Sequence, residues 1–264
     1  MERRNAWLSY KEAEETEMEK LAKAYREFLD KGKTERECVA EIVKEAEAAG
    51  YESLESKLEK GEKIKAGDKV YAVGMKKIVA LFHVGTEELS GGMSILCAHI
   101  DSPRLDVKQN PLYEDTDLAY LDTHYYGGVK KYQWVTLPLA LHGVIVKTDG
   151  TIQEVSIGEK EEDPVFVVTD LLIHLAGKQM EKKASVVIEG EKLDLLIGSR
   201  PLEKEERLDE SEKEAVKANV MRILTDYYDY GRGRFSFSRA GDRSGRKGKR
   251  VWSGQKYDRC LWTG

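Results

Sequence analysis

Cysteine is scarce in this chain, and its distribution excludes several kinds of protein. The 264 residues contain three cysteines, Cys38, Cys97 and Cys260, which lie far apart and form no Cys-x-x-Cys pair. This spacing predicts neither a disulfide framework nor a zinc site built from thiolates. A reducing, cytoplasmic setting is therefore expected.

Long apolar segments are also absent. No run of the sequence approaches the roughly 18 apolar residues that a membrane-spanning helix needs, and the N-terminus becomes acidic where a signal peptide would be apolar. We therefore expect a protein that is not secreted and has no membrane partner. With 41% hydrophobic residues, the chain can still build a substantial core.

Charge is distributed unevenly along the sequence. The formal net charge of −5 argues against a general nucleic-acid binder. Residues 231–264 nevertheless carry ten Lys and Arg residues against two Asp residues. An Arg- and Gly-rich composition is typical of tails that bind nucleic acid, so RNA binding by this tail is one hypothesis.

Helical and strand patterns follow one another in the first hundred residues. Residues 6–30 place apolar side chains at helical spacing, and a second helix is expected after the N-cap Thr34, whose capping box includes Glu37. From Lys69 the apolar period changes to two, which predicts strands over 69–85 and 93–100. Helices followed by strands indicate an α/β layer.

The sequence over 105–200 has a different character, with short strand-like runs separated by Gly-Gly, Asp-Gly and Gly-Glu turns. It predicts a mainly β module with one short helix around 169–181, and helical spacing returns over 212–228. The expected domains are an α/β domain over 1–104, an inserted β-rich domain over 105–205, a helix returning to the first domain over 206–230, and a disordered tail over 231–264.

His99 and Asp101 stand at the end of the strand predicted over 93–100. Open α/β sheets usually place their chemistry at the carboxyl ends of strands. There an imidazole can bind a divalent metal through one nitrogen while a carboxylate orients the ring through the other. A hydrogen-bonded structural histidine is the other interpretation of this pair, and the pair alone leaves both open.

Four longer segments carry a resemblance to one known family. They are HIDSPRLDVKQNPLYE, LDTHYYGGVKKYQWVTLPLALHG, DPVFVVTDLLIHLA and LLIGSRPL. In this order and spacing they resemble the aminopeptidase I and aspartyl aminopeptidase family of zinc metallopeptidases, particularly its bacterial and yeast aminopeptidase I branch. The resemblance covers roughly residues 5–230.

The resemblance implies an architecture and an activity. The expected fold is an α/β catalytic domain with a site for two zinc ions, interrupted by a β-rich domain that forms dimer contacts. Dimers of such enzymes assemble into a dodecamer and remove the N-terminal residue from a peptide substrate. By this resemblance His99 is the first metal ligand and Asp101 is the carboxylate that orients it.

The remaining ligands of the family lie downstream of anything present in this chain. One histidine with its partner cannot hold two zinc ions, so the chain alone is expected to be inactive. The residues considered as substitutes are Asp106, Asp122, His124 and His142. His142 lies in an apolar alternation, which is typical of a buried structural histidine.

Residues 124–134 form a second candidate region. In the family the corresponding loop reaches the active site of a neighbouring subunit, where polar groups contact the substrate. On this chain the matching side chains are His124, Lys130, Lys131 and Tyr132, and Lys and Tyr donors suit an oxyanion. The alternative is a hairpin with exposed aromatic residues at a dimer interface.

Two functional classes follow. The first is a zinc-dependent aminopeptidase of which this chain holds only the first metal-ligand region. The second is a non-catalytic oligomerisation or regulatory subunit that uses the β-rich domain.

A change of reading frame near residue 231 is a further prediction. Residues 231–264 can be back-translated with synonymous codons that, read one nucleotide later, spell a sequence resembling the family's continuation. Sequencing of the locus is expected to reveal that family sequence in the neighbouring frame. A locus without it would contradict the prediction.

Overall fold

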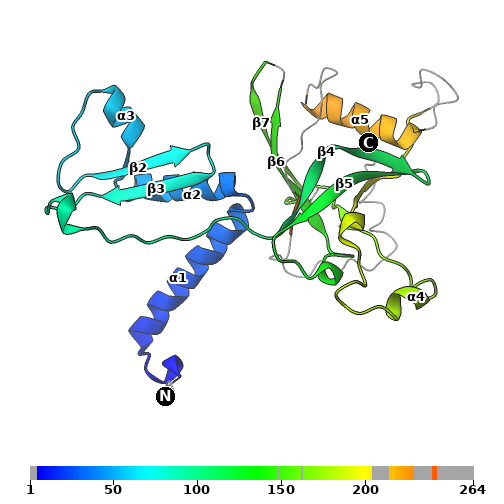
Figure 1. The fold of residues 1–264 in the computed structure, drawn as a ribbon, viewed down its shortest axis with the longest axis horizontal. Helices are drawn as coiled ribbons and strands as arrows, with labels where there is room; N and C mark the ends of the chain where they lie inside the picture. Colours follow the sequence, from blue (N-terminus) through cyan, green and yellow to red (C-terminus); the bar gives the residue numbers. More distant parts are fainter. Residues whose placement is uncertain (1–4, 148, 162, 204–213, 229–239, 243–264) are drawn as a thin grey trace. The chain divides into compact units, whose positions relative to one another are not determined.

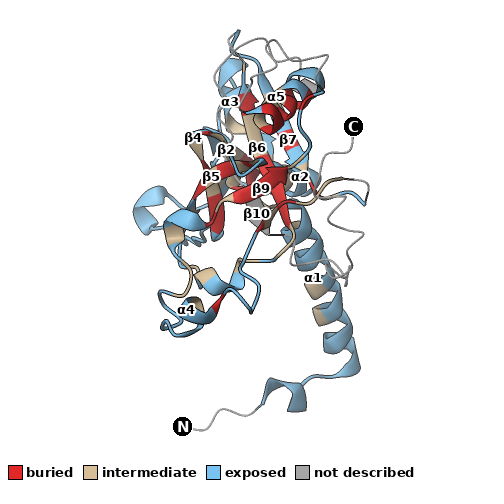
Figure 2. Ribbon diagram, turned by 90° about the vertical axis from the view of Figure 1, so that its right-hand side faces the viewer, coloured by how far each residue is buried: buried red, intermediate tan, exposed pale blue. Residues whose placement is uncertain are grey.

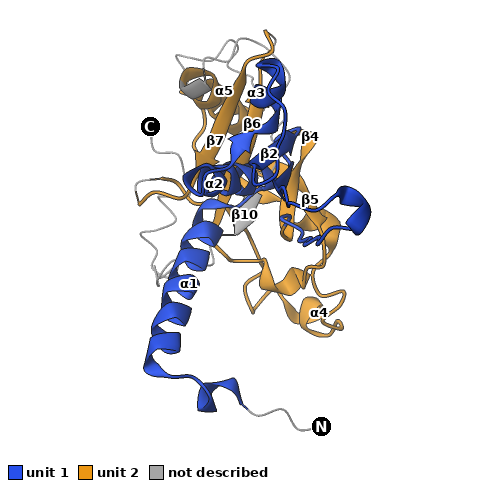
Figure 3. Ribbon diagram, turned by 90° about the vertical axis from the view of Figure 1, so that its left-hand side faces the viewer, with its two compact units in different colours: residues 1–101 blue, residues 102–264 orange. Residues whose placement is uncertain are grey.

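The computed structural model describes residues 5–147, 149–161, 163–203, 214–228 and 240–242. The chain divides into two compact units, residues 1–101 and residues 102–264 (Figure 3). None of the helices in the described ranges is long and apolar enough to span a membrane.

Unit 1 begins with the two helices that the spacing predicts. A 3-10 turn over Ala6–Leu8 precedes α1 (Glu12–Lys31), and α2 (Glu35–Ala48) follows. The capping box of α2 is confirmed, because the Thr34 hydroxyl accepts from the Glu37 amide at 3.3 Å and the Glu37 carboxylate accepts from the Thr34 amide at 2.8 Å.

A three-stranded sheet completes unit 1. Its elements are β1 (Glu52–Ser53), β2 (Lys69–Gly74) and β3 (Ile78–His83), with the short helix α3 (Leu54–Glu59) between β1 and β2. The strand order is β1-β2-β3, with β1 parallel to β2. Strands β2 and β3 are antiparallel (Figure 1). The Tyr71 hydroxyl donates to Glu47 at 2.7 Å, which ties β2 to the end of α2.

The strand predicted over 93–100 is absent, so that prediction is wrong. After a 3-10 turn over Leu89–Gly91, residues 92–103 have no regular secondary structure. Ile95 is 68% exposed and Leu96 is fully exposed. A strand is stabilised by hydrogen bonds to a neighbouring strand, and no strand of the described ranges pairs with this segment. His99 therefore lies on an irregular segment.

Unit 2 is built on a seven-stranded sheet, which confirms the mainly β prediction for 105–200. The strand order is β7-β6-β10-β4-β5-β9-β8, and each pair of neighbouring strands is antiparallel. The strands are β4 (Arg104–Asp115), β5 (Leu118–Tyr126), β6 (Leu139–Val146), β7 (Ile152–Ile157), β8 (Val167–Val168), β9 (Leu195–Gly198) and β10 (Ala240–Asp242).

Strand β10 comes from the basic tail. Its three residues, Ala240–Asp242, pair with β4 on one side and β6 on the other, so this part of the tail is paired rather than disordered. The other residues of 231–264 lie outside the described ranges, and the prediction for them stays a prediction.

Helix α5 (Ala215–Tyr228) confirms the helix predicted over 212–228. It was expected to return the chain to the first domain, but it packs on the sheet of unit 2. The physical reason is a stripe of Val216, Val220 and Leu224 at i, i+4 and i+8, which joins the sheet's apolar cluster. Figure 2 shows buried residues on both the sheet and α5.

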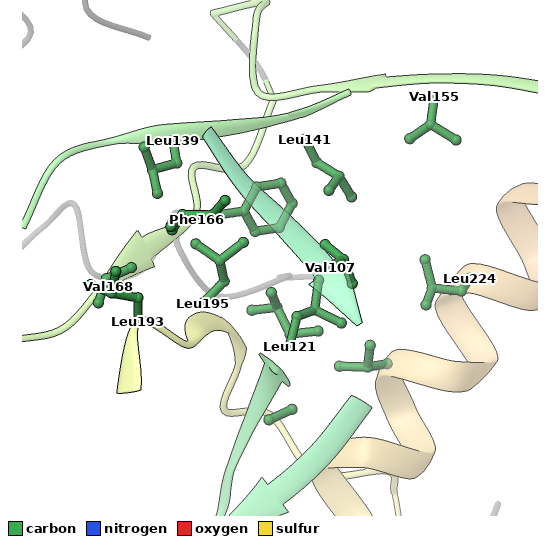
Figure 4. Packing of buried hydrophobic residues seen from close by; sticks show 14 of the residues in the cluster. Val107, Leu121, Leu139, Leu141, Val155, Phe166, Val168, Leu193, Leu195 and Leu224 are labelled. Carbon is green, nitrogen blue, oxygen red and sulfur yellow. The ribbon is translucent and has the colours of Figure 1, made fainter. Parts of the chain in front are cut away.

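The core of unit 2 is formed by side chains of the sheet together with α5. Leu121, Leu195 and Phe166 project into it from three strand regions (Figure 4). Leu105, Leu139 and Leu195 are fully buried.

The prediction of a helix around 169–181 is mostly wrong, because only α4 (Gly177–Met180) is helical in this range. Outside it, short 3-10 turns cover Lys131–Gln133 and Gly190–Lys192. The apolar residues of 171–175 are more than half exposed. A short helix needs a packed apolar face for its stability, and these side chains do not provide one.

A cluster of polar side chains links β4 and β5 to Asp194, the residue before β9. The Tyr113 hydroxyl donates to Asp194 at 2.8 Å, and the Thr123 amide donates to the same carboxylate at 3.1 Å. The Tyr113 and Tyr120 rings stack with centroids 5.4 Å apart. Burial, followed by the bond to Asp194, raises the pKa of the Tyr113 hydroxyl well above its ordinary value.

This raised pKa predicts a loss of stability in alkali. The native state favours the neutral Tyr113 hydroxyl, so its contribution is complete below the pKa of an unfolded tyrosine, about 10, and is lost as the pH rises above it. Urea unfolding at about pH 9 and about pH 11 measures the free energy of unfolding. Its decrease between these two pH values should be smaller for Tyr113→Phe than for the wild type. The exposed control Tyr10→Phe should behave as the wild type, and equal decreases in all three proteins would contradict the prediction.

Candidate functional site

The His99 ring is held by Asp101, as expected for a metal ligand with an orienting carboxylate. Its Nδ1 lies 3.3 Å from the Asp101 carboxylate and 3.0 Å from the Asp101 carbonyl oxygen. With the proton on Nδ1, the ring donates to Asp101 and presents the lone pair of Nε2 to a metal. The His99 side chain is 85% exposed, so Nε2 is accessible.

Cys38 fixes the segment that carries this pair, a role that the sequence pattern did not reveal. The thiol of Cys38, on α2, lies 3.6 Å from the carbonyl oxygen of Ile100, between the two site residues. Burial raises the pKa of this thiol, which keeps it protonated and able to donate. Its neighbour Gly32 leaves it room, because a Cβ there would lie 2.8 Å from the sulfur.

The candidate substitute ligands are occupied by other partners. Asp106 accepts from Arg104 at 2.8 Å, and Asp122 pairs with Lys108 at 2.8 Å. His142 is buried, and its Nε2 lies 3.0 Å from Glu159, which confirms the prediction of a structural histidine.

A complete zinc site is not present in the part of the chain that the structure describes. No group of three or more His, Cys, Asp or Glu side chains there could hold a metal ion. Zinc sites use three or four protein ligands. The described residues thus fit one ligand and its orienting partner, and do not fit a dinuclear centre.

Arg104 is buried at the point where the chain enters β4. Its Nε donates to Asp106 at 2.8 Å and its Nη1 to the Ser102 carbonyl oxygen at 3.1 Å. The guanidinium carbon lies 3.7 Å from the centre of the Tyr126 ring, which is opposite Arg104 in the β4–β5 register. Arg104 therefore joins the first residues of unit 2 to both strands of this hairpin.

Two residues of the predicted substrate loop contact the Tyr125 ring. The His124 ring stacks on Tyr125 with centroids 5.1 Å apart, and the Lys131 ammonium lies 5.3 Å from the Tyr125 centroid. Lys130 is exposed, and Tyr132 is 41% exposed. His124 lies on β5, whereas Lys130, Lys131 and Tyr132 follow that strand, and none of the four predicted residues lies in the core.

A charged surface adjoins the loop, and the sequence did not single it out. Lys108 bridges Asp122 at 2.8 Å and Glu191 at 3.2 Å, and Glu191 also lies 3.2 Å from Nδ1 of His124. The hydrogen bond from Lys108 lowers the pKa of the Glu191 carboxyl. This network holds the 3-10 turn at Glu191 against β4 and β5.

Comparison with protein-family models gives one match. Residues 28–231 match the family described as aminopeptidase I zinc metalloprotease (M18). A probable M18 family aminopeptidase 1 of Clostridium acetobutylicum is 58% identical over 228 residues, which are 86% of this chain and 48% of the relative. The chain therefore spans about half the length of the curated relatives it matches.

Comparison with solved structures also finds similarity to M18 aminopeptidases. An M18 aminopeptidase from Thermotoga maritima has a TM-score of 0.80 and 43% sequence identity, and the match covers 91% of this chain and 50% of that one. The S. cerevisiae mApe1 dodecamer has a TM-score of 0.57 at 16% identity, with 85% and 48% covered. This second likeness concerns the fold alone.

Arg104 is predicted to stabilise unit 2. Arg104→Met should lower the free energy of unfolding by about 2 kcal/mol, because the substitution removes a partner of the half-buried Asp106. Arg104→Lys should lower it less, since an ammonium keeps the charge but loses the planar stacking. The control Lys192→Met removes an exposed ion pair to Glu189 and should cost no more than about 0.5 kcal/mol. Urea unfolding measures the free energy of unfolding of all three variants. An unchanged value for Arg104→Met would contradict the stabilising role of Arg104.

Proposed function

Because this chain belongs to the aminopeptidase I (M18) family of zinc metalloproteases, we propose that it takes part in removing N-terminal residues from peptides. The observation that carries the proposal is the His99–Asp101 pair, which lies inside the matched range 28–231 and has one imidazole nitrogen accessible. The scarcity and wide spacing of the cysteines fit a cytoplasmic setting for this peptidase activity.

In this proposal His99 is the first ligand of a site for two zinc ions, and Asp101 orients its ring. Asp101 acts through Nδ1, and Cys38 positions the backbone between the two residues. Holding the ring in one orientation lowers the entropic cost of binding a metal. The described residues supply one ligand, so the rest of the ligand set has to come from outside them.

We assign the loop around Tyr125 to substrate contact in the site of a neighbouring copy. Cationic and hydroxyl donors are available here, because His124, Lys130 and Tyr132 are exposed and Lys131 is half-buried. Such donors can bind the carbonyl oxygen or the carboxylate of a peptide. This role requires a homo-oligomer, and the fold is shared with an aminopeptidase that was solved as a dodecamer.

A non-catalytic oligomerisation or regulatory subunit is the second candidate. It is favoured by the contrast between the incomplete ligand set and the complete core of unit 2. Unit 2 could then join copies of the chain, or full-length relatives, without hydrolysing peptides itself.

A peptidase assay tests whether this chain catalyses hydrolysis by itself. The purified 264-residue chain, supplied with zinc, manganese or cobalt and with leucyl or aspartyl anilides, is expected to show no turnover, because one ligand cannot hold the metal centre. His99→Ala tests the ligand, and His83→Ala provides a matched control on the exposed strand β3. Turnover that is abolished by His99→Ala and retained by His83→Ala would contradict the ligand count and establish catalysis by this chain alone.

A further inference from the structure

Tyr125, near the end of β5, is held by contacts with other side chains. Its ring stacks on His124 with centroids 5.1 Å apart, and the Lys131 ammonium lies 5.3 Å from the ring centre. The half-buried Tyr125 side chain also packs against the apolar cluster of unit 2. Tyr125 is therefore a fixed point from which the following loop, 127–133, departs.

Gly190 adjoins this ring at a position where a side chain would not fit. A Cβ at position 190 would overlap Cε1 of Tyr125, and it would lie 2.9 Å from Cδ1 of the same ring. It would also lie 3.4 Å from Cδ of Lys131. Carbon atoms in contact are normally about 3.5–4.0 Å apart. The Gly190 backbone therefore lies against the Tyr125 ring and close to the Lys131 side chain.

Residues 190–194, which we call the clasp, are bonded to β5 at successive positions. The Glu191 carboxylate lies 3.2 Å from Nδ1 of His124. The Thr123 hydroxyl donates to the Leu193 carbonyl oxygen at 2.6 Å, and both residues are fully buried. A hydrogen bond that is shielded from water is stronger than an exposed one. The clasp is thus anchored in the core, and its first residue reaches the Tyr125 ring.

The loop after Tyr125 begins with two glycines. Gly127 has a positive φ of 79° and is followed by Gly128. A glycine pair leaves the direction of the backbone open, so other contacts have to fix the 3-10 turn Lys131–Gln133 that follows. The Lys131 ammonium over the Tyr125 ring is such a contact, because it links the turn back to β5.

We propose that the clasp positions the donors of this loop, with Gly190 as the positioning residue. By leaving room for the Tyr125 ring, Gly190 lets the ring hold Lys131. The turn that follows Lys130 and contains Tyr132 is then held in one place. The proposal rests on the proposed function for the task of these donors, since they are assigned there to substrate contact. Donors that are fixed in advance lower the entropic cost of binding a peptide.

A role for Gly190 in packing alone makes a different prediction. Substitution of Gly190 would then change the free energy of unfolding and leave the accessibility of Lys131 in the folded protein as it is. A positioning role couples Gly190 to Lys131 through the Tyr125 ring. The accessibility of the Lys131 amine therefore distinguishes the two roles.

Lysine acylation measures this accessibility. The full 264-residue chain is treated with a limiting amount of N-hydroxysuccinimidyl acetate, and the rate at each lysine is determined by mass spectrometry. Gly190→Ala should raise the rate at Lys131 by about two- to fivefold, the factor expected for loss of an exposed cation–π contact. The reason is that the added methyl group displaces the Tyr125 ring. Urea unfolding verifies that the variant is folded.

Gly177→Ala is the matched control, because a Cβ at Gly177 would meet no atom within 4 Å. Its rate at Lys131 should equal that of the wild type. Tyr125→Leu should raise the rate as Gly190→Ala does, and the two substitutions together should have no larger effect, since both remove the same contact. An unchanged rate in Gly190→Ala, an equal rise in the control, or additive effects of the two substitutions would each overturn the proposal.

Glu191→Gln tests the clasp without adding a side chain at its first residue. It weakens the pairs of Glu191 with His124 and Lys108, and it should raise the rate at Lys131 by about twofold. The neighbouring acid Glu189 pairs with lysines outside β4 and β5, so Glu189→Gln should leave the rate unchanged. Equal rates in these two variants would contradict the holding role of the clasp.

A peptide probe separates this inference from the proposed function. N-acetyl-alanyl-alanine offers carbonyl oxygens and a carboxylate, and it has no amine that would consume the reagent. A loop that contacts substrate should be protected by millimolar probe, which would slow the acylation of Lys130 and Lys131 in the wild type and slow it less in Gly190→Ala. The variant effects without such protection would support the clasp and contradict the substrate role of the loop. The variant effects together with protection would support both.

Discussion

The apolar contact between the seven-stranded sheet and α5 is the interaction on which unit 2 depends. Leu105, Leu139 and Leu195 of the sheet are fully buried, and Val216 and Val220 of the helix belong to the same apolar cluster. Burial on this scale outweighs the conformational entropy of ordering the strands. The β4–β5 hairpin forms part of this sheet, and Arg104 and Tyr125 both lie at its open end, where Arg104 is opposite Tyr126 and Leu105 is opposite Tyr125.

Unit 1 carries the candidate metal ligand without a comparable core. Its hydrogen bonds include the capping box of α2, the bond between Tyr71 and Glu47, and the contact between Cys38 and Ile100. Each such bond contributes little net free energy.

Much of the local structure follows from the sequence. Thr34 and Glu37 mark the start of α2 because their side chains satisfy backbone amides within four residues. His99 and Asp101 were identified as a pair because two residues of spacing bring them into contact. The strand over 93–100 and most of the helix over 169–181 were wrong, because their patterns require a packed neighbour that these segments do not have.

The sequence by itself determined the family, the capped helices, the mainly β character of 105–200 and the pairing of His99 with Asp101. Only the tertiary structure decided that Arg104 stacks on Tyr126, that Asp194 joins Tyr113 to Thr123, and that α5 remains on unit 2. These contacts join residues distant in the chain, and strand register places them opposite one another. Local patterns specify which side chains can be buried, but the partners that bury them depend on how separate segments meet in space.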